Sequence, residues 1–177
     1  MALVIGTNCG FVTVAPTTNP DVGGLPIDYY ARATKFTSPV GEQTITEMGW
    51  FLNGNPGDPG EEWQLGIYND NGGKPGTLLA SATGIIGVAA TWQVASSFEY
   101  VVASETDYWL AAVQAASSPQ TDCAWFETGG DDYSLDLNTD TLANPWVEAS
   151  SGVYLMGIYA KYGGSSVAPA LVFGCNF

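Results

Sequence analysis

Two clusters of turn-forming residues, only eight residues apart, constrain this chain more than any other feature of its sequence. Residues 53–60 read NGNPGDPG and residues 69–76 read NDNGGKPG. Glycine, proline, asparagine and aspartate at this density favour tight turns and are incompatible with the interior of a helix or a strand. Between the clusters, residues 62–68 alternate in polarity, with Trp63 and Ile67 on one face. We therefore expect a short half-buried strand between two turns, as in a β protein.

Further strands are expected along the whole chain, because similar alternation recurs and no window shows an apolar period of about 3.6 residues with helix caps. We expect them at residues 29–37, 44–52, 77–82, 85–95, 98–102, 108–114, 124–128, 133–137, 153–162 and 171–173. Short strands that follow one another at intervals of roughly 8–15 residues are typical of sandwiches and barrels. The sequence therefore predicts an all-β fold, a two-sheet antiparallel β-sandwich of jelly-roll type.

Two terminal regions fit this pattern less well. Residues 1–28 are rich in threonine, proline, glycine and valine, which indicates an extended N-terminal arm. Residues 163–166 read GGSS, so we expect residues 163–177 to form a hinge and a final edge strand. The sandwich domain is assigned to residues 29–162. Such arms either reach onto a neighbouring molecule or pack against their own domain.

The charge balance excludes several classes of partner. The 177 residues contain 18 Asp and Glu but only 4 Lys and Arg, which gives a net charge of −14. Four scattered cations cannot supply the counterion release that drives nucleic-acid binding, and an anionic membrane surface would repel the chain. No stretch approaches the roughly 18 apolar residues of a membrane-spanning helix. We therefore expect no nucleic acid as a partner and no insertion into a membrane.

The absence of histidine limits the chemistry further. It excludes Ser-His-Asp and Cys-His catalysis, histidine-ligated metals and an imidazole base. Carboxylates remain, but a glycosidase needs two of them at a defined separation across a bound sugar, and the sequence does not show such a pair. We expect a protein that is not an enzyme. The 46% content of hydrophobic residues excludes intrinsic disorder.

The N-terminus lacks the pattern of a secretory signal. A signal peptide has a basic segment followed by about 7–15 apolar residues, whereas here the apolar run ends at Ile5 and the first cation is Arg32. We therefore expect synthesis in the cytoplasm, and an extracellular location if a signal peptide was removed before residue 1.

Three cysteines leave two interpretations open. Cys9 and Cys175 lie near opposite ends of the chain, and the termini of a domain are often close together, so these two form a candidate disulfide. The alternative is three reduced, buried thiols that act as small hydrophobic groups, as in cytosolic proteins. The sequence contains no Cys-x-x-Cys spacing, which argues against a thiolate metal site.

Calcium is the one cofactor that the loops could hold, and no cofactor is required by the sequence. Asp70, in the sequence Asp-Asn-Gly-Gly, and the pair Asp131 and Asp132 offer the oxygen ligands that calcium prefers. Neither segment has the spacing of an EF-hand loop. For Asp70 the alternative is an Asx turn that closes a hairpin.

Six tryptophans and nine tyrosines raise the question of sugar stacking or of a protein interface, because both use amphipathic rings. Trp146, in the loop sequence Asn-Pro-Trp-Val, is the best candidate for an exposed ring. Tyr133 and Trp125 are the other candidate ligand-binding residues, and Trp125 can equally belong to the core. The remaining strand tryptophans are expected in the core: Trp50, Trp63 and Trp109.

Part of the chain resembles a diffuse group of β-sandwich modules. The resemblance covers residues 33–113 and rests on four segments: KFTSP at 35–39, ITEMG at 45–49, IYNDNGGKPGTLL at 67–79 and YWLAAV at 108–113. Similar modules occur in secreted bacterial surface proteins and in tailed-phage structural proteins. The resemblance implies a jelly-roll-like sandwich used for display, binding or assembly, without a fixed ligand and without enzymatic activity.

Together these features predict a non-enzymatic structural protein, a virion surface component such as a capsid decoration or a fibre subunit. We expect a homo-oligomer seated on a larger protein lattice, located on the virion surface after cytoplasmic synthesis. One alternative is a carbohydrate-binding or adhesin module, for which the partner is a glycan. Another is the subunit of an extracellular filament whose copies exchange an arm such as residues 1–28.

Overall fold

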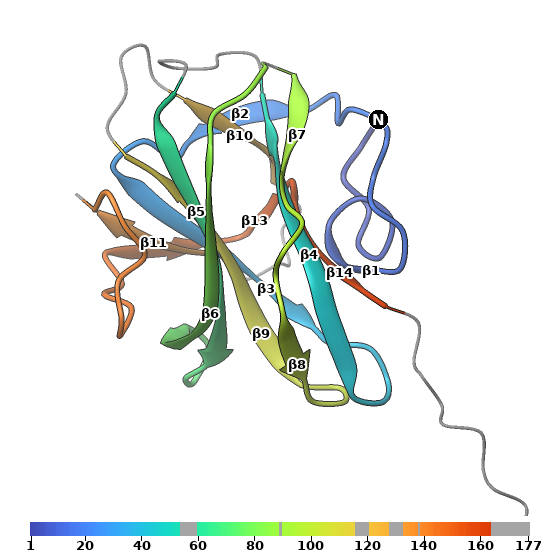
Figure 1. Ribbon diagram of the computed structural model, residues 1–177. Helices are drawn as coiled ribbons and strands as arrows, with labels where there is room; N and C mark the ends of the chain where they lie inside the picture. Colours follow the sequence, from blue (N-terminus) through green and yellow to red (C-terminus); the bar gives the residue numbers. More distant parts are fainter. Residues whose placement is uncertain (54–59, 89, 116–120, 128–132, 138, 164–177) are drawn as a thin grey trace, which may run out of the picture.

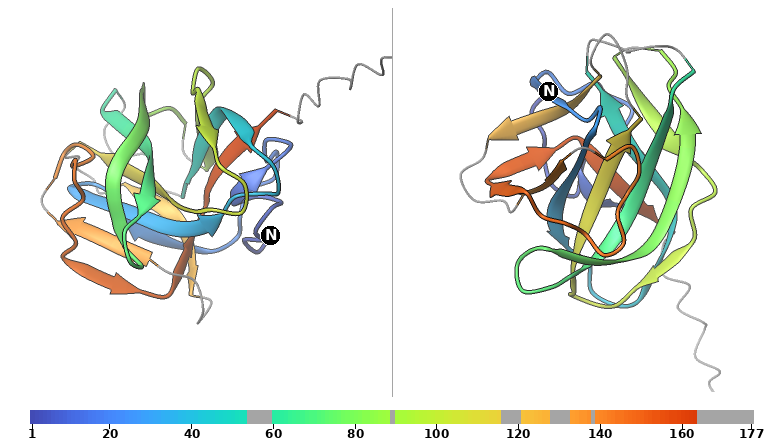
Figure 2. Two further views of the ribbon diagram at one scale, coloured as in Figure 1. Left: turned by 90° about the horizontal axis from the view of Figure 1, so that it is seen from below. Right: turned by 90° about the vertical axis from the view of Figure 1, so that its left-hand side faces the viewer.

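The structure is a computed structural model of the chain, and it describes residues 1–53, 60–88, 90–115, 121–127, 133–137 and 139–163. For residues 126, 127 and 133–137 it describes the backbone alone. Every regular element in these residues is a β-strand, and the strands form two sheets that enclose a common core (Figure 1). One sheet is curled like a half-barrel (Figure 2). The predicted all-β, two-sheet fold is confirmed.

The larger sheet has eight strands and is built around one long central strand. Its main order is β1-β14-β4-β10-β13, with β2 paired to β10 and with β7 and β8 paired to β4. Its strands are β1 (Gly10–Val12), β2 (Gly23–Pro26), β4 (Gln43–Leu52), β7 (Thr91–Ala95), β8 (Tyr100–Val102), β10 (Asp122–Glu127), β13 (Tyr154–Met156) and β14 (Ile158–Tyr162). All its pairings are antiparallel except that of β1 with β14, which is parallel.

The smaller sheet has six strands in the order β12-β11-β3-β9-β5-β6, and all its neighbours are antiparallel. The strands are β3 (Tyr30–Thr37), β5 (Glu62–Asp70), β6 (Pro75–Ile85), β9 (Asp107–Gln114), β11 (Tyr133–Leu137) and β12 (Ser150–Gly152). The turn predicted at residues 69–76 is the β5–β6 hairpin, where Gly72 and Gly73 take φ values of 69° and 88° that favour glycine. The other predicted turn lies almost entirely outside the described residues.

Two of the expected strands are interrupted. The segment predicted as one strand at 85–95 divides into the end of β6 and the start of β7, and Ala90 between them has a φ of 54°. The segment predicted at 153–162 divides into β13 and β14 at Gly157. Alternation of side chains indicates extended backbone, but it does not show where a strand leaves one neighbour for another.

The N-terminal segment takes part in the larger sheet. Residues 1–28 contribute β1 and β2, and they place Leu3, Cys9, Phe11 and Ile27 in the main hydrophobic core. This is the packing expected of a segment that covers its own domain. The proposed division at residues 28 and 162 stays a prediction.

The core lies between the two sheets, and a second apolar cluster lies outside the smaller one. On β9 the side chains alternate: Leu110 and Ala112 face the main core, whereas Trp109, Ala111 and Val113 belong to the second cluster. The segment 139–149 covers that outer cluster with Leu142 and Trp146. Both faces of the smaller sheet are therefore largely buried, which explains why β9 is apolar from Tyr108 to Val113.

Candidate functional site

The aromatic residue predicted to be most exposed is buried. Trp146 is 7% exposed, and its ring lies edge-to-face on Tyr68 with 5.1 Å between the ring centroids. Its backbone N–H donates to the Gly76 carbonyl at 3.0 Å, and the Tyr68 hydroxyl donates to the Ala143 carbonyl at 2.7 Å. The expectation of an exposed ring at Trp146 is wrong, because its loop folds onto the apolar outer face of the smaller sheet.

Tyr133 is the first residue of β11, where its backbone lies opposite Thr34 on one side and Gly152 on the other. Its side chain lies outside the described part of the structure. A ligand-binding role for Tyr133 therefore stays a prediction.

Trp125 is half-buried, and its ring lies across the glycines of β2. The indole Nε1–H donates to the Gly24 carbonyl at 2.7 Å. A Cβ atom at Gly23 would lie 3.0 Å from the same Nε1, so the glycine provides the space for the ring. The Tyr154 ring stands edge-to-face against Trp125 at 4.8 Å. Two amphipathic rings with partial access to solvent are thus fixed where β2, β10 and β13 meet.

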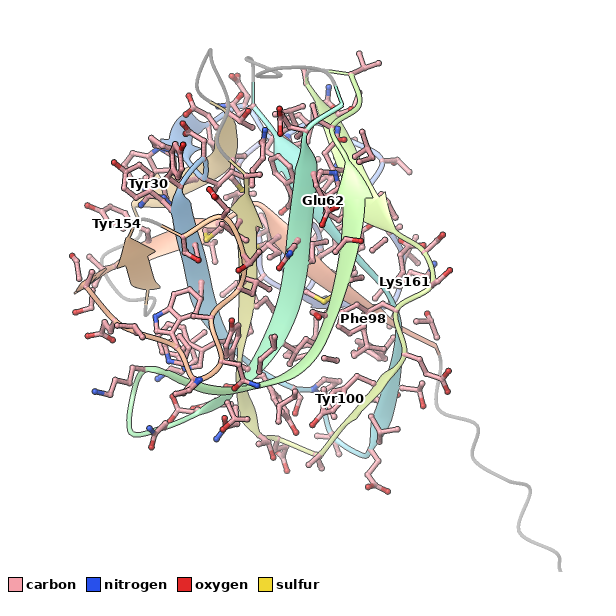
Figure 3. The ribbon with its side chains drawn as sticks, turned by 60° about the vertical axis from the view of Figure 1, so that its left-hand side comes forward. Tyr30, Glu62, Phe98, Tyr100, Tyr154 and Lys161 are labelled. Atoms are coloured by element: carbon pink, nitrogen blue, oxygen red, sulfur yellow. The ribbon has the colours of Figure 1, made fainter. Side chains whose placement is uncertain are left out.

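Strand β3 brings an arginine and a third ring close to this pair. The Arg32 guanidinium lies over the Tyr30 ring at 5.4 Å from its centroid, and Arg32 Nε donates to the Pro26 carbonyl. Thr34 on the same face of β3 donates from Oγ1 to the Tyr154 carbonyl at 3.4 Å. Tyr30 and Tyr154 lie on the same side of the molecule (Figure 3). Tyr30, Arg32, Trp125 and Tyr154 are called the aromatic–arginine site below.

The carboxyl group of Asp28 lies close to this site and is partly removed from water. Burial raises the pKa of Asp28, and the like charge of Asp122 adds to the rise, whereas a bond from its own backbone N–H and the charge of Arg32 oppose it. Asp28 Oδ1 is buried without a hydrogen-bond partner among the described residues. Arg32 therefore lies near the carboxyl group of Asp28, which is partly removed from water and has one oxygen without a hydrogen bond among the described residues.

Unpaired polar atoms continue from Asp28 into the core. Gln114, which forms an isolated bridge with Asp28, is fully buried, and neither Oε1 nor Nε2 has a hydrogen-bond partner in the described part of the chain. Trp63 lies opposite Gln114 on β5, and its ring meets that of Trp50 edge-to-face at 6.5 Å. Both indole N–H groups also lack an acceptor among the described residues. Such groups are rare in folded proteins, because each costs about 1–3 kcal/mol when left unbonded.

Of the three predicted calcium ligands, the structure describes only Asp70. Both oxygens of Asp70 accept hydrogen bonds, Oδ1 from Trp109 Nε1 at 2.8 Å and Oδ2 from the Gly73 backbone N–H at 3.2 Å. The second bond is the Asx-type turn that was the alternative to calcium. Asp131 and Asp132 lie outside the described residues. Within those residues, no group of three or more His, Cys, Asp or Glu is placed to hold a metal ion.

The cysteines show what burial does to a thiol. Cys123 on β10 is fully buried, and burial raises its pKa to about 12, so it stays protonated and packs as a small hydrophobic group. Cys9 is also fully buried. Its predicted partner Cys175 lies outside the described residues, and the disulfide stays a prediction.

The free edge of the smaller sheet is a second candidate site, which the sequence interpretation did not single out. Strand β6 is the last strand of its sheet, and within the described residues it pairs only with β5. The Ile86 N–H donates to the Glu61 carbonyl at 2.9 Å, so even-numbered residues from 80 to 86 direct their backbone groups toward β5. Ser81, Thr83 and Ile85 must then direct theirs outward.

The two halves of this edge differ. The first half is covered by the 139–149 segment: the Gly76 carbonyl accepts from the Trp146 N–H, and the Leu78 N–H donates to Asn144 Oδ1 at 3.2 Å. The second half, residues 79–85, reads LASATGI and contains no charge and no proline. On the side that faces away from β5, no strand of the described structure pairs with this half.

No helix among the described residues is long and apolar enough to cross a membrane. No protein-family model, no curated protein and no solved structure matches the chain. The resemblance of residues 33–113 to β-sandwich modules of surface and phage proteins therefore stays a prediction.

Proposed function

We propose that this chain is a non-enzymatic structural subunit that assembles with further copies of itself into a larger protein lattice. The setting that we propose is the virion surface, as a capsid decoration or a fibre subunit, reached after synthesis in the cytoplasm. A jelly-roll topology is part of the same proposal. The observation that carries it is the uncharged half of the β6 edge, residues 79–85.

Folded proteins normally protect such an edge. A strand at the border of a sheet presents unpaired N–H and C=O groups that can pair with another chain, and charges, prolines or covering loops usually prevent this. This chain covers the first half of β6 with its own loop. It has 18 acidic residues, yet none lies in the second half. An edge left neutral in so acidic a chain is suited to contact with another subunit.

Assembly can be tested with one substitution at the edge. Thr83→Lys places a charge beside the outward-facing backbone groups, and the proposal predicts that the variant remains monomeric at concentrations where the wild type forms oligomers. Light scattering after size-exclusion chromatography measures the mass, and electron microscopy shows any lattice. Thr46→Lys is the matched control, because Thr46 is also an exposed strand threonine but lies on β4, inside the other sheet. A monomeric wild type at every concentration would contradict the proposal.

Carbohydrate binding, as in an adhesin, is the second candidate. The aromatic–arginine site supports it, because rings bind the apolar faces of sugars and nearby polar groups bind their hydroxyls. Trp125→Ala is expected to abolish any glycan signal on an array, whereas Trp92→Ala, a half-buried tryptophan elsewhere, should retain it. A wild type that binds no glycan, with or without calcium, would remove this candidate.

A further inference from the structure

We infer that the uncharged half of the β6 edge receives residues 167–173 of a neighbouring copy as an added strand. This inference rests on the assembly function proposed above and names the partner of that edge. Adding a strand to an exposed sheet edge is a recurrent mode of recognition, in which backbone hydrogen bonds provide much of the affinity.

The edge has the right chemistry for this partner. Ser81, Thr83 and Ile85 each present an outward N–H and C=O, and the side chains of all three are exposed, that of Ile85 to 57%. The side chains of Ala80 and Ala82, which alternate with them, pack against the main core. The added strand would therefore extend a sheet that is already held in place, without any rearrangement of β6.

The C-terminal segment has a complementary sequence. Residues 164–177 read GSSVAPALVFGCNF and carry no charged side chain. Val167, Leu171, Val172 and Phe173 are apolar residues, and the last three form a short β-prone run. The preceding glycines and serines have the composition of a flexible linker. A neutral segment suits a neutral edge, whereas an acidic strand of this chain would not.

Charge also favours a tail over direct contact between the folded bodies. Each copy has a net charge of −14, so two copies repel each other at short range. Residues 164–166, which would join Gly163 to the added strand, span up to roughly 10–11 Å in extended conformation. That reach is somewhat longer than the Debye length of about 8 Å at physiological ionic strength. A tail can therefore join two subunits while their acidic surfaces stay apart.

The position of β14 is consistent with a partner in another molecule. The segment follows Gly163, whose N–H donates to the carbonyl of Thr44 in β4 of the larger sheet. Strand β6 is an edge of the other sheet; in Figure 1 it runs down the middle of the molecule, whereas β14 ends at the lower right. A segment from a neighbouring copy approaches β6 directly, without crossing the body of its own domain.

Proline defines the register of the added strand. Pro169 has no N–H, so its backbone must face away from β6. Backbone groups alternate in direction along a strand, so Ala168, Ala170 and Val172 would direct theirs toward the edge. Val172→Pro then removes a donor that the edge needs, whereas Leu171→Pro removes one that faces away.

The experiment uses full-length chains with single substitutions and measures mass by light scattering. Val172→Pro and Thr83→Pro should each reduce the oligomer fraction at least tenfold, and Leu171→Pro should reduce it much less. Thr83→Pro does not remove a bond to β5, because the Thr83 N–H faces outward. Thermal unfolding of each variant checks that the fold is intact, and Thr83→Lys serves if the proline variant unfolds. A synthetic peptide of residues 164–177 should bind wild-type chains and not Thr83→Pro.

Other results would overturn the inference in distinguishable ways. Oligomers that survive Val172→Pro but not Thr83→Pro would show that the edge binds something else, such as the β6 edge of a second copy. Oligomers that survive both substitutions would show that another surface is used. In these two cases the proposed assembly function stands and the named partner is wrong. A wild-type chain that is monomeric, with the β6 amides protected by its own residues 167–173, would contradict both the assembly function and the proposed partner.

Discussion

The outer faces of the two sheets are both covered by aromatic rings, but they are covered in different ways. On the smaller sheet, Trp146 and Leu142 from the 139–149 segment form a buried cluster with Tyr68 and Trp109. On the larger sheet the rings of Phe51 and Tyr159 both meet Trp92 edge-to-face, at 5.3 and 5.2 Å.

The two covers differ in what holds them. The 139–149 segment buries large side chains, whereas residues 18 and 19 contact the larger sheet beside Trp92 through hydrogen bonds, from Trp92 Nε1 to the Thr18 carbonyl and from Asn19 to the Ala90 carbonyl. The larger sheet also carries an ion pair beside its rings, in which Lys161 Nζ lies 3.0 Å from Glu47 Oε2. The first cover should therefore contribute more to stability than the second, because apolar burial exceeds exposed polar contacts in free energy.

Truncation of the two tryptophans tests this difference most strongly. Trp146→Ala should lower the free energy of unfolding by about 3–5 kcal/mol, because it leaves a cavity over Tyr68. Trp92→Ala should cost less, about 1–3 kcal/mol, because its ring is half-buried. Urea unfolding measures both, and Val147→Ala, at an exposed neighbour of Trp146, is the control. Equal losses at the two tryptophans would remove the distinction between the covers.

Substitution of a glycine beneath each set of rings gives the next largest loss of stability. Here the larger sheet should lose more than the smaller one. A Cβ at Gly49 would lie 2.5 Å from the Tyr159 ring, whose hydroxyl is bonded to Glu47 Oε1 at 2.8 Å and cannot easily move. Gly49→Ala should therefore cost about 1–3 kcal/mol through overpacking.

At Gly66 the nearest atoms are the ends of two flexible leucine side chains, those of Leu142 and Leu78. Gly66→Ala should consequently cost less than about 1 kcal/mol, because leucine methyl groups can rotate away. The urea midpoints of unfolding of Gly49→Ala and Gly66→Ala, each compared with the wild type, measure the two losses. A larger loss at Gly66 would show that the leucine-lined cover is the more rigid of the two.

The pH dependence of stability gives a smaller effect that is specific to the larger sheet. Burial raises the pKa of Tyr159, and the hydrogen bond to Glu47 and its negative charge raise it further. Above about pH 10 the unfolded tyrosine loses its proton while the folded one keeps it, so stability decreases as the pH rises. Tyr159→Phe should make the fall in the free energy of unfolding between pH 9 and pH 11 shallower. The change in slope should correspond to at most one proton. An unchanged slope would contradict the assigned burial of this hydroxyl.

The smallest expected effect belongs to the ion pair. Lys161→Met should lower the free energy of unfolding by about 0.2–1 kcal/mol, and most of that difference should disappear in high salt. Lys74→Met, at an exposed position in the β5–β6 turn, is the control. A loss above about 2 kcal/mol at Lys161 would mean that this outer face depends on charge far more than its exposure indicates.

Local pattern was sufficient to predict the class of the fold. Alternation identified β5, and the Asn-Gly-Gly turn identified the β5–β6 hairpin, because both depend on neighbouring residues. Strand β2 was missed, since a Gly-Gly start is rare in strands. Its glycines are needed because the Trp125 ring and the Asp122 side chain occupy the space where a Cβ would lie.

The candidate sites depend on distant contacts and were predicted less well. Trp125 is half-buried, so ligand binding and core packing, the two alternatives left open for it, both stay predictions. Trp146 was misplaced because Asn-Pro-Trp has the composition of an exposed loop, and the residue that buries it, Tyr68, lies far away in the sequence. The β6 edge follows from the strand order, which side-chain alternation cannot reveal.

Hydrogen exchange at single amides of β6 tests the central claim, that another chain covers this edge, most directly. In dilute wild-type protein the N–H groups of Ser81, Thr83 and Ile85 should exchange quickly, whereas those of residues 80, 82 and 84, bonded to β5, should be protected. At concentrations that give oligomers, the account predicts that all six become protected. If the three outward amides exchange equally fast in monomer and oligomer, the edge is not the assembly surface, and the account is wrong.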